Sequence, residues 1–206
     1  MTDIEYVHDR DAAQIAQWLG DRIAERLAAK DTPVAICVPG GSTPFPIFAE
    51  LVKRDLDFAR LEIWPNDDRI VPEDHEASNT GKIRALFEPV GAKVVALAPD
   101  LDVPAFDLVW LGMGEDGHIA SLFPNIDPQT DDAQGIRVLT PDPLPPHAPF
   151  DRITLTLPAL VRTDALMFVI RGEEKRAVFD AAAAGESDLP VARLLRGVSQ
   201  TVTCFT

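Results

Sequence analysis

Short runs in which almost every residue is apolar are the feature that most constrains the fold of this chain. Pro33–Val38, Asp107–Leu111 and Ala165–Ile170 are such runs, each of strand length. A strand with one face in water alternates apolar and polar residues, whereas a strand buried on both faces, as in a parallel sheet, is apolar throughout. Further strands are expected at Leu61–Trp64, Val94–Leu97 and Thr201–Phe205, and a cleanly alternating one at Arg152–Leu157.

Segments with the periodicity of a helix separate these runs. From Asp9 to about Lys30 apolar residues recur every four positions, and Asp9 or Asp11 is placed to cap that helix. Shorter helices are expected around Ile47–Leu51, Ile83–Phe87, Val178–Phe179 and Val191–Leu195. This alternation predicts an α/β fold, namely a three-layer α/β/α sandwich with a mostly parallel central sheet. The 206 residues are expected to form one domain, residues 1–206.

The charge balance limits the partners of this chain. Its 33 acidic residues against 19 basic ones give a net charge of -14. Such a surface repels nucleic acid and anionic membranes, so we expect neither as a partner. A small anionic substrate remains possible, because a few basic side chains and helix N-termini suffice to bind one. The N-terminus has no signal-peptide pattern and no apolar run approaches ~18 residues, so we expect a cytoplasmic protein.

The cysteines and histidines predict neither a disulfide nor a metal site. Cys37 and Cys204 are expected to be unpaired thiols of a reducing compartment. The 4 histidines lie far apart and lack the spacing of zinc ligands. We interpret His75 as an exposed loop residue, and His147 as part of a long irregular segment, Pro124–Pro149.

A glycine-rich turn follows the first of the apolar runs. The chain there reads Pro39-Gly40-Gly41-Ser42-Thr43-Pro44, and a helical pattern begins. Gly40 and Gly41 expose successive backbone amides, and Ser42 and Thr43 add hydroxyls at a helix N-terminus, whose dipole attracts anions. The turn therefore predicts an anion site, with ordinary helix capping by Ser42 or Thr43 as the structural alternative. Neither a P-loop nor a Gly-x-Gly-x-x-Gly fingerprint is present here, so no nucleotide cofactor is expected.

Charged residues follow two of the other runs. In Asp67-Asp68-Arg69, the arginine is suited to hold a phosphate and one aspartate to bind a sugar hydroxyl; the alternative is a solvated turn with a surface ion pair. Lys175 lies at the start of the helix after Ala165–Ile170. A helix dipole disfavours a cation there unless an anion is bound beside it, and the alternative is an ordinary surface lysine.

The fourth cluster combines glycines with a histidine. Asp107–Leu111 is followed by Gly112-Met113-Gly114-Glu115-Asp116-Gly117-His118. In α/β sheets ligands bind at the carboxyl ends of strands, where His118 is placed to act as a base, with Asp116 two residues away. The structural alternative is a tight turn whose histidine caps a helix. Taken together, the four clusters predict a site for a phosphorylated small molecule that undergoes acid–base chemistry.

These segments resemble those of the glucosamine-6-phosphate isomerase/6-phosphogluconolactonase family, and in particular of its lactonase branch. The matching segments are Gly40–Pro44, Asp67–Pro72 with Ser78-Asn79, Leu111–Pro124, Arg152–Leu157, and Gly172 with Lys175. The resemblance implies a Rossmann-like three-layer fold. It also implies hydrolysis of 6-phospho-D-glucono-1,5-lactone, a phosphorylated sugar lactone of the pentose phosphate and Entner–Doudoroff pathways, by a monomer or homodimer without a cofactor.

The resemblance also implies roles for individual residues. His118 would be the general base that activates water, a role suited to an imidazole near neutral pH, with Asp116 or the loop backbone orienting its ring. Substrate-binding residues would hold the 6-phosphate and the sugar. They are Gly40, Gly41, Ser42, Thr43, Asp67, Arg69, Gly117, Arg152 and Lys175.

The chain departs from the family pattern at two places. The lactonases usually have Asp-Glu-Arg where this chain has Asp67-Asp68-Arg69, which leaves the role of Asp68 open, and Thr203-Cys204-Phe205 lacks a usual tryptophan. One alternative function is the aldose–ketose chemistry of the isomerase branch, but that branch has a glutamate in the segment where this chain has Ser121-Leu122-Phe123-Pro124. The other is a non-catalytic sugar-phosphate sensor.

Overall fold

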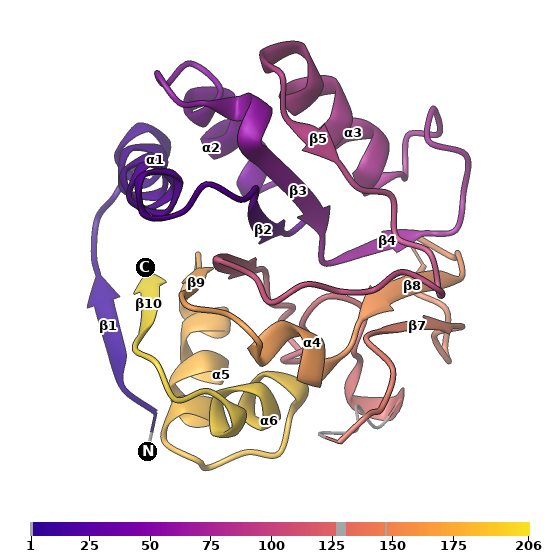
Figure 1. Cartoon of the computed structure of the whole chain (residues 1–206). Helices are drawn as coiled ribbons and strands as arrows, with labels where there is room; N and C mark the ends of the chain where they lie inside the picture. Colours follow the sequence, from indigo (N-terminus) through magenta and orange to yellow (C-terminus); the bar gives the residue numbers. More distant parts are fainter. Residues whose placement is uncertain (1, 127–130, 147) are drawn as a thin grey trace.

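The computed structural model describes residues 2–126, 131–146 and 148–206 (Figure 1). A seven-stranded sheet forms its centre, with strand order β1-β10-β9-β6-β2-β3-β5 and every neighbouring pair parallel. Its strands are β1 (Ile4–Val7), β2 (Val34–Val38), β3 (Leu61–Pro65), β5 (Lys93–Val94), β6 (Leu108–Leu111), β9 (Leu166–Val169) and β10 (Val202–Phe205). The predicted α/β fold with a mostly parallel sheet is therefore confirmed.

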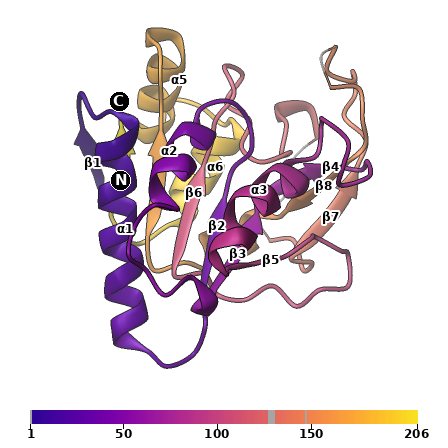
Figure 2. The ribbon, with the colours of Figure 1, turned by 90° about the horizontal axis from the view of Figure 1, so that it is seen from above.

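Helices cover both faces of this sheet, as the apolar runs require. One face carries α1 (Ala12–Ala29), α2 (Pro44–Leu51) and α3 (Asn79–Phe87), and the other carries α4 (Leu157–Val161), α5 (Glu173–Ala183) and α6 (Pro190–Gly197) (Figures 1 and 2). Successive strand residues alternate between the two faces. In β2, Ile36 packs in the apolar cluster under α1–α3, and its neighbour Cys37 packs in the cluster under α4–α6. Three short 3-10 helices complete the elements of the described residues: Phe58–Arg60, Glu88–Val90 and Pro124–Ile126.

The long helix α1 forms for the reasons that its sequence predicts. Asp11 caps it: its side chain accepts from the backbone of Gln14, and the Gln14 side chain accepts from the backbone of Asp11. This capping box satisfies two backbone donors at the helix start. The predicted apolar stripe is buried against the sheet through Ile15, Leu19, Ile23 and Leu27.

A second, antiparallel sheet, which was not expected from the sequence, lies beside the first. Its order is β4-β8-β7, with β4 (Asp67–Arg69), β8 (Arg152–Leu155) and β7 (Ile136–Leu139). The expected strand Arg152–Leu157 thus belongs to this sheet and ends two residues early, where the chain turns into α4. The segment Pro124–Pro149, expected to be irregular, contributes β7. The four residues of β7 are too few to show an alternating pattern, and the strand is held by its hydrogen bonds to β8.

Several other expectations agree with the structure or differ from it only in detail. The strand expected at Val94–Leu97 shortens to Lys93–Val94, and β1 at the sheet edge was not expected. Cys37 and Cys204 are both free, as predicted, and both are buried. His147 lies outside the described residues. Among the described residues, none of the helices has the length and apolarity needed to span a membrane.

The strand order creates one place where a ligand site is expected. From β2 the chain moves to β3 on one side, whereas from β6 it moves to β9 on the other. The loops after β2 and β6 therefore diverge to opposite faces and leave a crevice at the carboxyl ends of these neighbours. Gly40–Thr43 follows β2 and Gly112–His118 follows β6.

Candidate active site

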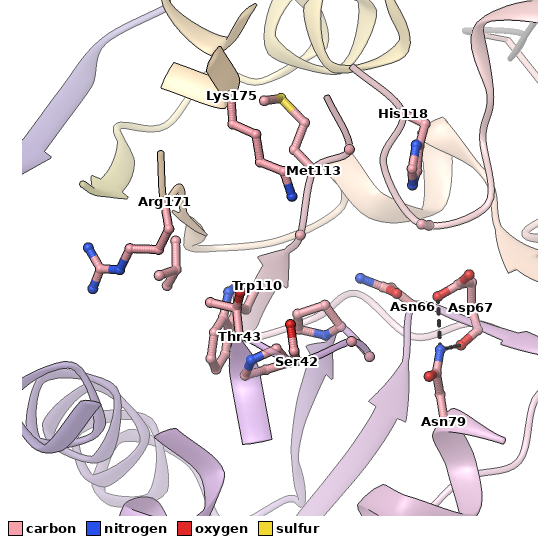
Figure 3. Close-up of a pocket in the computed structure, with 18 of the residues that line it drawn as sticks. Ser42, Thr43, Asn66, Asp67, Asn79, Trp110, Met113, His118, Arg171 and Lys175 are labelled. Atoms are coloured by element: carbon pink, nitrogen blue, oxygen red, sulfur yellow. Dashed lines mark hydrogen bonds between the residues drawn. The ribbon is translucent and has the colours of Figure 1, made fainter. Parts of the chain in front are cut away.

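A pocket of about 350 Å³ occupies this crevice, and all four predicted clusters line it. Figure 3 shows Ser42, Thr43, Arg171 and Lys175 around one part of the pocket, and His118, Asn66 and Asp67 around another. The predicted residues that line it are Gly40, Gly41, Ser42, Thr43, Asp67, Arg69, His118 and Lys175. Asp116, Gly117 and Arg152 are not part of the lining, although each contacts or supports residues that are.

His118 projects into the pocket from the loop after β6 (Figure 3). Its Nδ1 lies 2.6 Å from Asp116 Oδ1, and its ring centroid lies 4.7 Å from that of Phe123. A carboxylate only accepts hydrogen bonds, so in the neutral imidazole Nδ1 holds the proton and Nε2 keeps its lone pair. The arrangement leaves Nε2 able to accept a proton, which is what a general base requires.

The loop can hold His118 in this place because Gly114 has no side chain. A Cβ on Gly114 would lie 2.2 Å from the His118 ring and 2.6 Å from Asp116 Oδ1. The Gly114 amide donates to the His118 carbonyl at 2.9 Å, which closes the turn. Gly117 supports the same turn from behind, since its carbonyl accepts from Val191 at the start of α6. The helix-capping alternative for His118 is wrong, because no helix begins there: Ile119 and Leu122 form isolated bridges on either side of a short turn.

The anion site predicted at the start of α2 lacks a side-chain cap. Thr43 is the N-cap residue, its side chain makes no capping hydrogen bond, and Pro44 follows as the first helical residue. Gly40 is needed for a packing reason: a Cβ there would lie 2.1 Å from the side-chain oxygen of Asn79. Without an acceptor at its N-terminus, α2 presents its positive dipole end to the pocket.

Two cations face this end of α2 from the other side of β6. Lys175 is half-buried in the first turn of α5, and its ammonium has no carboxylate partner within the described part of the chain. Arg171 lies two residues after the end of β9, lines the same pocket and donates to the backbone carbonyl of Arg10 at 2.6 Å. An anion bound between them and the N-terminus of α2 would meet positive potential on both sides.

Asp67 and Asp68 are buried, so the alternative of a solvated turn is wrong. Asp67 accepts hydrogen bonds from the Ser121 hydroxyl and from the side-chain amide of Asn79. Burial raises the pKa of the Asp67 carboxyl. Asp68 has a structural role. It accepts from the backbone amides of Asn79 at 2.6 Å and Thr80 at 2.8 Å, and so caps α3.

Arg69 and Arg152 are neighbours across the antiparallel pair β4·β8. Arg69 lines the pocket and donates to the Ala77 carbonyl at 2.9 Å. Arg152 is buried, donates to the Ala148 carbonyl at 2.9 Å, and has its pKa lowered by burial and by Arg69. The structure therefore places Arg152 beside Arg69 and off the pocket surface.

Several residues of the site were not predicted from the sequence. Asn66, Trp110, Met113, Ala120 and Arg171 all line the pocket. Arg171 and Asn66 had a detectable signal, because each lies within two residues of the end of a predicted strand. Ser121 and Asn79 were noted only as part of a motif, and their contact with Asp67 required the tertiary structure.

The family model described as "Glucosamine-6-phosphate isomerases/6-phosphogluconolactonase" matches residues 8–97 and 87–203 of this chain. A protein of Neisseria meningitidis named 6-phosphogluconolactonase is 36% identical over 222 residues, which cover 94% of each chain. A protein of Pseudomonas aeruginosa with the same name is 33% identical and covers 90% of this chain and 88% of its own length. The crystal structure of a 6-phosphogluconolactonase from Shewanella baltica has a TM-score of 0.83 and 26% identity, and covers 100% of this chain and 97% of its own.

Proposed function

This chain belongs to the glucosamine-6-phosphate isomerase/6-phosphogluconolactonase family, and we propose that His118 is the general base of the lactone hydrolysis that it catalyses. The chain is a lactone hydrolase with 6-phosphogluconolactonase activity, as its full-length relatives indicate. The reaction converts 6-phospho-D-glucono-1,5-lactone and water to 6-phospho-D-gluconate and a proton. The observation that supports the role of His118 is its 2.6 Å contact with Asp116 beside an anion-binding pocket.

The chemistry needs a proton acceptor, then a proton donor, at the same place. His118 Nε2 takes a proton from water as the water oxygen attacks the lactone carbonyl carbon, and the carbonyl electron pair moves onto its oxygen. The tetrahedral intermediate then collapses, the bond from this carbon to the ring oxygen breaks, and the imidazolium returns its proton to that oxygen. Asp116, 2.6 Å from Nδ1, stabilises the imidazolium between the two steps.

The phosphate and the sugar occupy different parts of the pocket in this proposal. Ser42 and the neighbouring amides at the start of α2, together with Lys175 and Arg69, hold the 6-phosphate. Asp67 binds hydroxyls of the sugar, because its oxygens are hydrogen-bond acceptors and a phosphate would be repelled there. The proposed steps involve no redox or group-carrying cofactor, because water is the only co-reactant.

One contact argues against the chemistry of the isomerase branch. That branch has a carboxylate after the histidine to support ring opening, and this chain has Phe123 in the corresponding segment. The Phe123 ring packs on His118, so an apolar surface faces the imidazole where a glutamate would be needed. An activity assay distinguishes an enzyme from a non-catalytic sugar-phosphate sensor.

The test is a side-by-side assay of freshly prepared 6-phosphogluconolactone and glucosamine 6-phosphate, with acid release corrected for spontaneous hydrolysis. The wild type should accelerate only the first reaction. His118→Ala should lower kcat by ~100-fold or more and keep its affinity for 6-phosphogluconate. His8→Ala is the matched control, because His8 is exposed and lies outside the pocket. Wild-type kcat in His118→Ala would remove His118 from the role of base.

The phosphate assignment has its own variant. Lys175→Met should raise KM for the phosphorylated lactone and change kcat little, because the phosphate is bound equally in the ground state and the transition state. Unphosphorylated gluconolactone should be hydrolysed equally by this variant and the wild type. If both lactones are affected to the same extent, Lys175 does not bind the phosphate.

A further inference from the structure

Asn66 has a buried side chain with no hydrogen-bond partner. It is 1% exposed, it lines the pocket, and neither its Oδ1 nor its Nδ2 is paired within the described residues. Buried side-chain amides are almost always hydrogen-bonded, because an unpaired one has lost its hydrogen bonds to water without forming others in the protein. An unpaired amide that faces a ligand pocket points to a bond that forms only when the ligand is present.

The backbone fixes Asn66 in this position. Its amide donates to the Val38 carbonyl at 2.9 Å, and its carbonyl accepts from Leu155 at 2.9 Å. Asn66 therefore joins the central sheet to the small antiparallel sheet, and its side chain has little freedom to seek a partner elsewhere. The adjacent Asp67 is already engaged by Ser121 and Asn79. Asn79, an asparagine of the same pocket, differs from Asn66 in donating to Asp67.

We propose that the Asn66 carboxamide binds hydroxyl groups of the lactone ring and so selects hydroxylated sugar lactones. This inference rests on the function proposed above. A carboxamide donates through Nδ2 and accepts through Oδ1, which matches a hydroxyl, a group that both donates and accepts. A phosphate only accepts, and two of the three cations that line the pocket, Lys175 and Arg171, lie in another part of it (Figure 3), with Arg69 the only one of the three near Asn66 in the chain. The position of Asn66 beside Asp67 makes the two side chains one sugar-binding surface.

The first test uses Asn66→Leu, which keeps a similar volume and removes both polar groups. The value of kcat/KM for 6-phosphogluconolactone should fall about 10- to 100-fold, as expected when ligand hydroxyls lose their partners. The unfolding midpoint should stay the same or rise, because the folded protein loses no hydrogen bond of its own. Asn79→Leu is the matched control: it breaks the bond to Asp67 and should lower both activity and the midpoint.

The second test locates the contact on the sugar. In the His118→Ala background, Asn66→Leu should weaken binding of 6-phosphogluconate about 10-fold or more and leave binding of inorganic phosphate within twofold. With lactones that lack single ring hydroxyls, the wild type should discriminate against at least one of them, and Asn66→Leu should not discriminate. Asn66→Ala serves in both tests if the leucine variant does not fold.

Two results would overturn the assignment. One is that Asn66→Leu keeps the wild-type kcat/KM and still discriminates among the lactones as the wild type does. The other is that Asn66→Leu loses affinity for phosphate and for 6-phosphogluconate to the same extent. Failure of the proposed function looks different, because the wild type itself would then not hydrolyse the lactone or His118→Ala would keep the wild-type rate. An active wild type with an unaffected Asn66→Leu rejects only the role of Asn66.

Discussion

Asp116→Asn tests whether the carboxylate orients His118 and stabilises its charged form. Asp116 Oδ1 lies 2.6 Å from His118 Nδ1 and 3.2 Å from the His118 amide. Asparagine has nearly the same shape, but its amide nitrogen can donate to Nδ1. The proton would then move to Nε2, and the base would face the substrate in the wrong tautomer.

The size of the effect follows from the contact and its exposure. A hydrogen bond to a charged group contributes ~1.5–3 kcal/mol. The Asp116 side chain is 52% exposed, so solvent screening places the loss toward the lower part of this range. A loss of ~1.5–2 kcal/mol in the transition state corresponds to a fall in kcat of roughly 10- to 30-fold. KM should change little, because Asp116 is not part of the pocket lining.

The assay is steady-state hydrolysis of 6-phosphogluconolactone by Asp116→Asn beside a matched control, Glu115→Gln. Glu115 is the exposed neighbour of Asp116, so this control removes the same charge without touching His118. It should retain the wild-type kcat. The reasoning is refuted if Asp116→Asn stays within twofold of wild type, or if Glu115→Gln loses as much activity. A rise in KM at constant kcat would instead make Asp116 a substrate-binding residue.

Further predictions concern stability. Burial raises the pKa of Asp67, so the native state keeps a proton that the unfolded state releases. The free energy of unfolding should therefore fall as pH rises from about 3.9 to the raised value. Asp67→Asn should lack this fall in urea titrations across pH, and an equal slope in both proteins would contradict the assignment. Asp107 is buried among Arg26, Lys30 and the Ala35 amide at the start of β6, far from the pocket. Asp107→Ala should lower the free energy of unfolding in urea by ~2–3 kcal/mol and leave kcat unchanged, because it breaks a buried ion pair. A loss below about 0.5 kcal/mol would contradict this reasoning. Burial raises the pKa of Cys37 and, to about 12, that of Cys204. Neither thiol should react with a disulfide reagent at about pH 8 until denaturant unfolds the chain, and rapid labelling of the native protein would refute this.

Much of the sheet could be predicted because burial on both faces leaves a local trace. Runs such as Pro33–Val38 and Ala165–Ile170 are apolar throughout, and each became a central strand. Because the strands of such a sheet are parallel, their carboxyl ends meet at one edge, which is why four weak clusters could be assigned to one pocket. The prediction needed only the order of strands and helices, not their register.

The small antiparallel sheet could not be predicted in the same way. Its strand β7, Ile136–Leu139, has only one fully buried residue, and β4 is three polar or charged residues, Asp67–Arg69. Neither has a pattern of its own, because each is held by hydrogen bonds to β8. The burial of Asp68 follows from this pairing. Its role in capping α3 depends on Asn79 and Thr80, eleven and twelve positions away in the chain.

Unpaired buried polar atoms gather at the junction of the two sheets, beside the pocket. Asn66, Arg69 and Arg152 supply most of the buried polar side-chain atoms that lack a hydrogen-bond partner in the described residues, and all three lie where the two sheets meet. Asp107, at the opposite end of the sheet, has every oxygen paired. A fold under selection for stability alone would pair or replace such groups, as it has at Asp107, since each unpaired atom costs free energy. Asn66 and Arg69 line the pocket, and a polar ligand that completes their hydrogen bonds would explain why their atoms are unpaired, with the second sheet holding Arg69 in place.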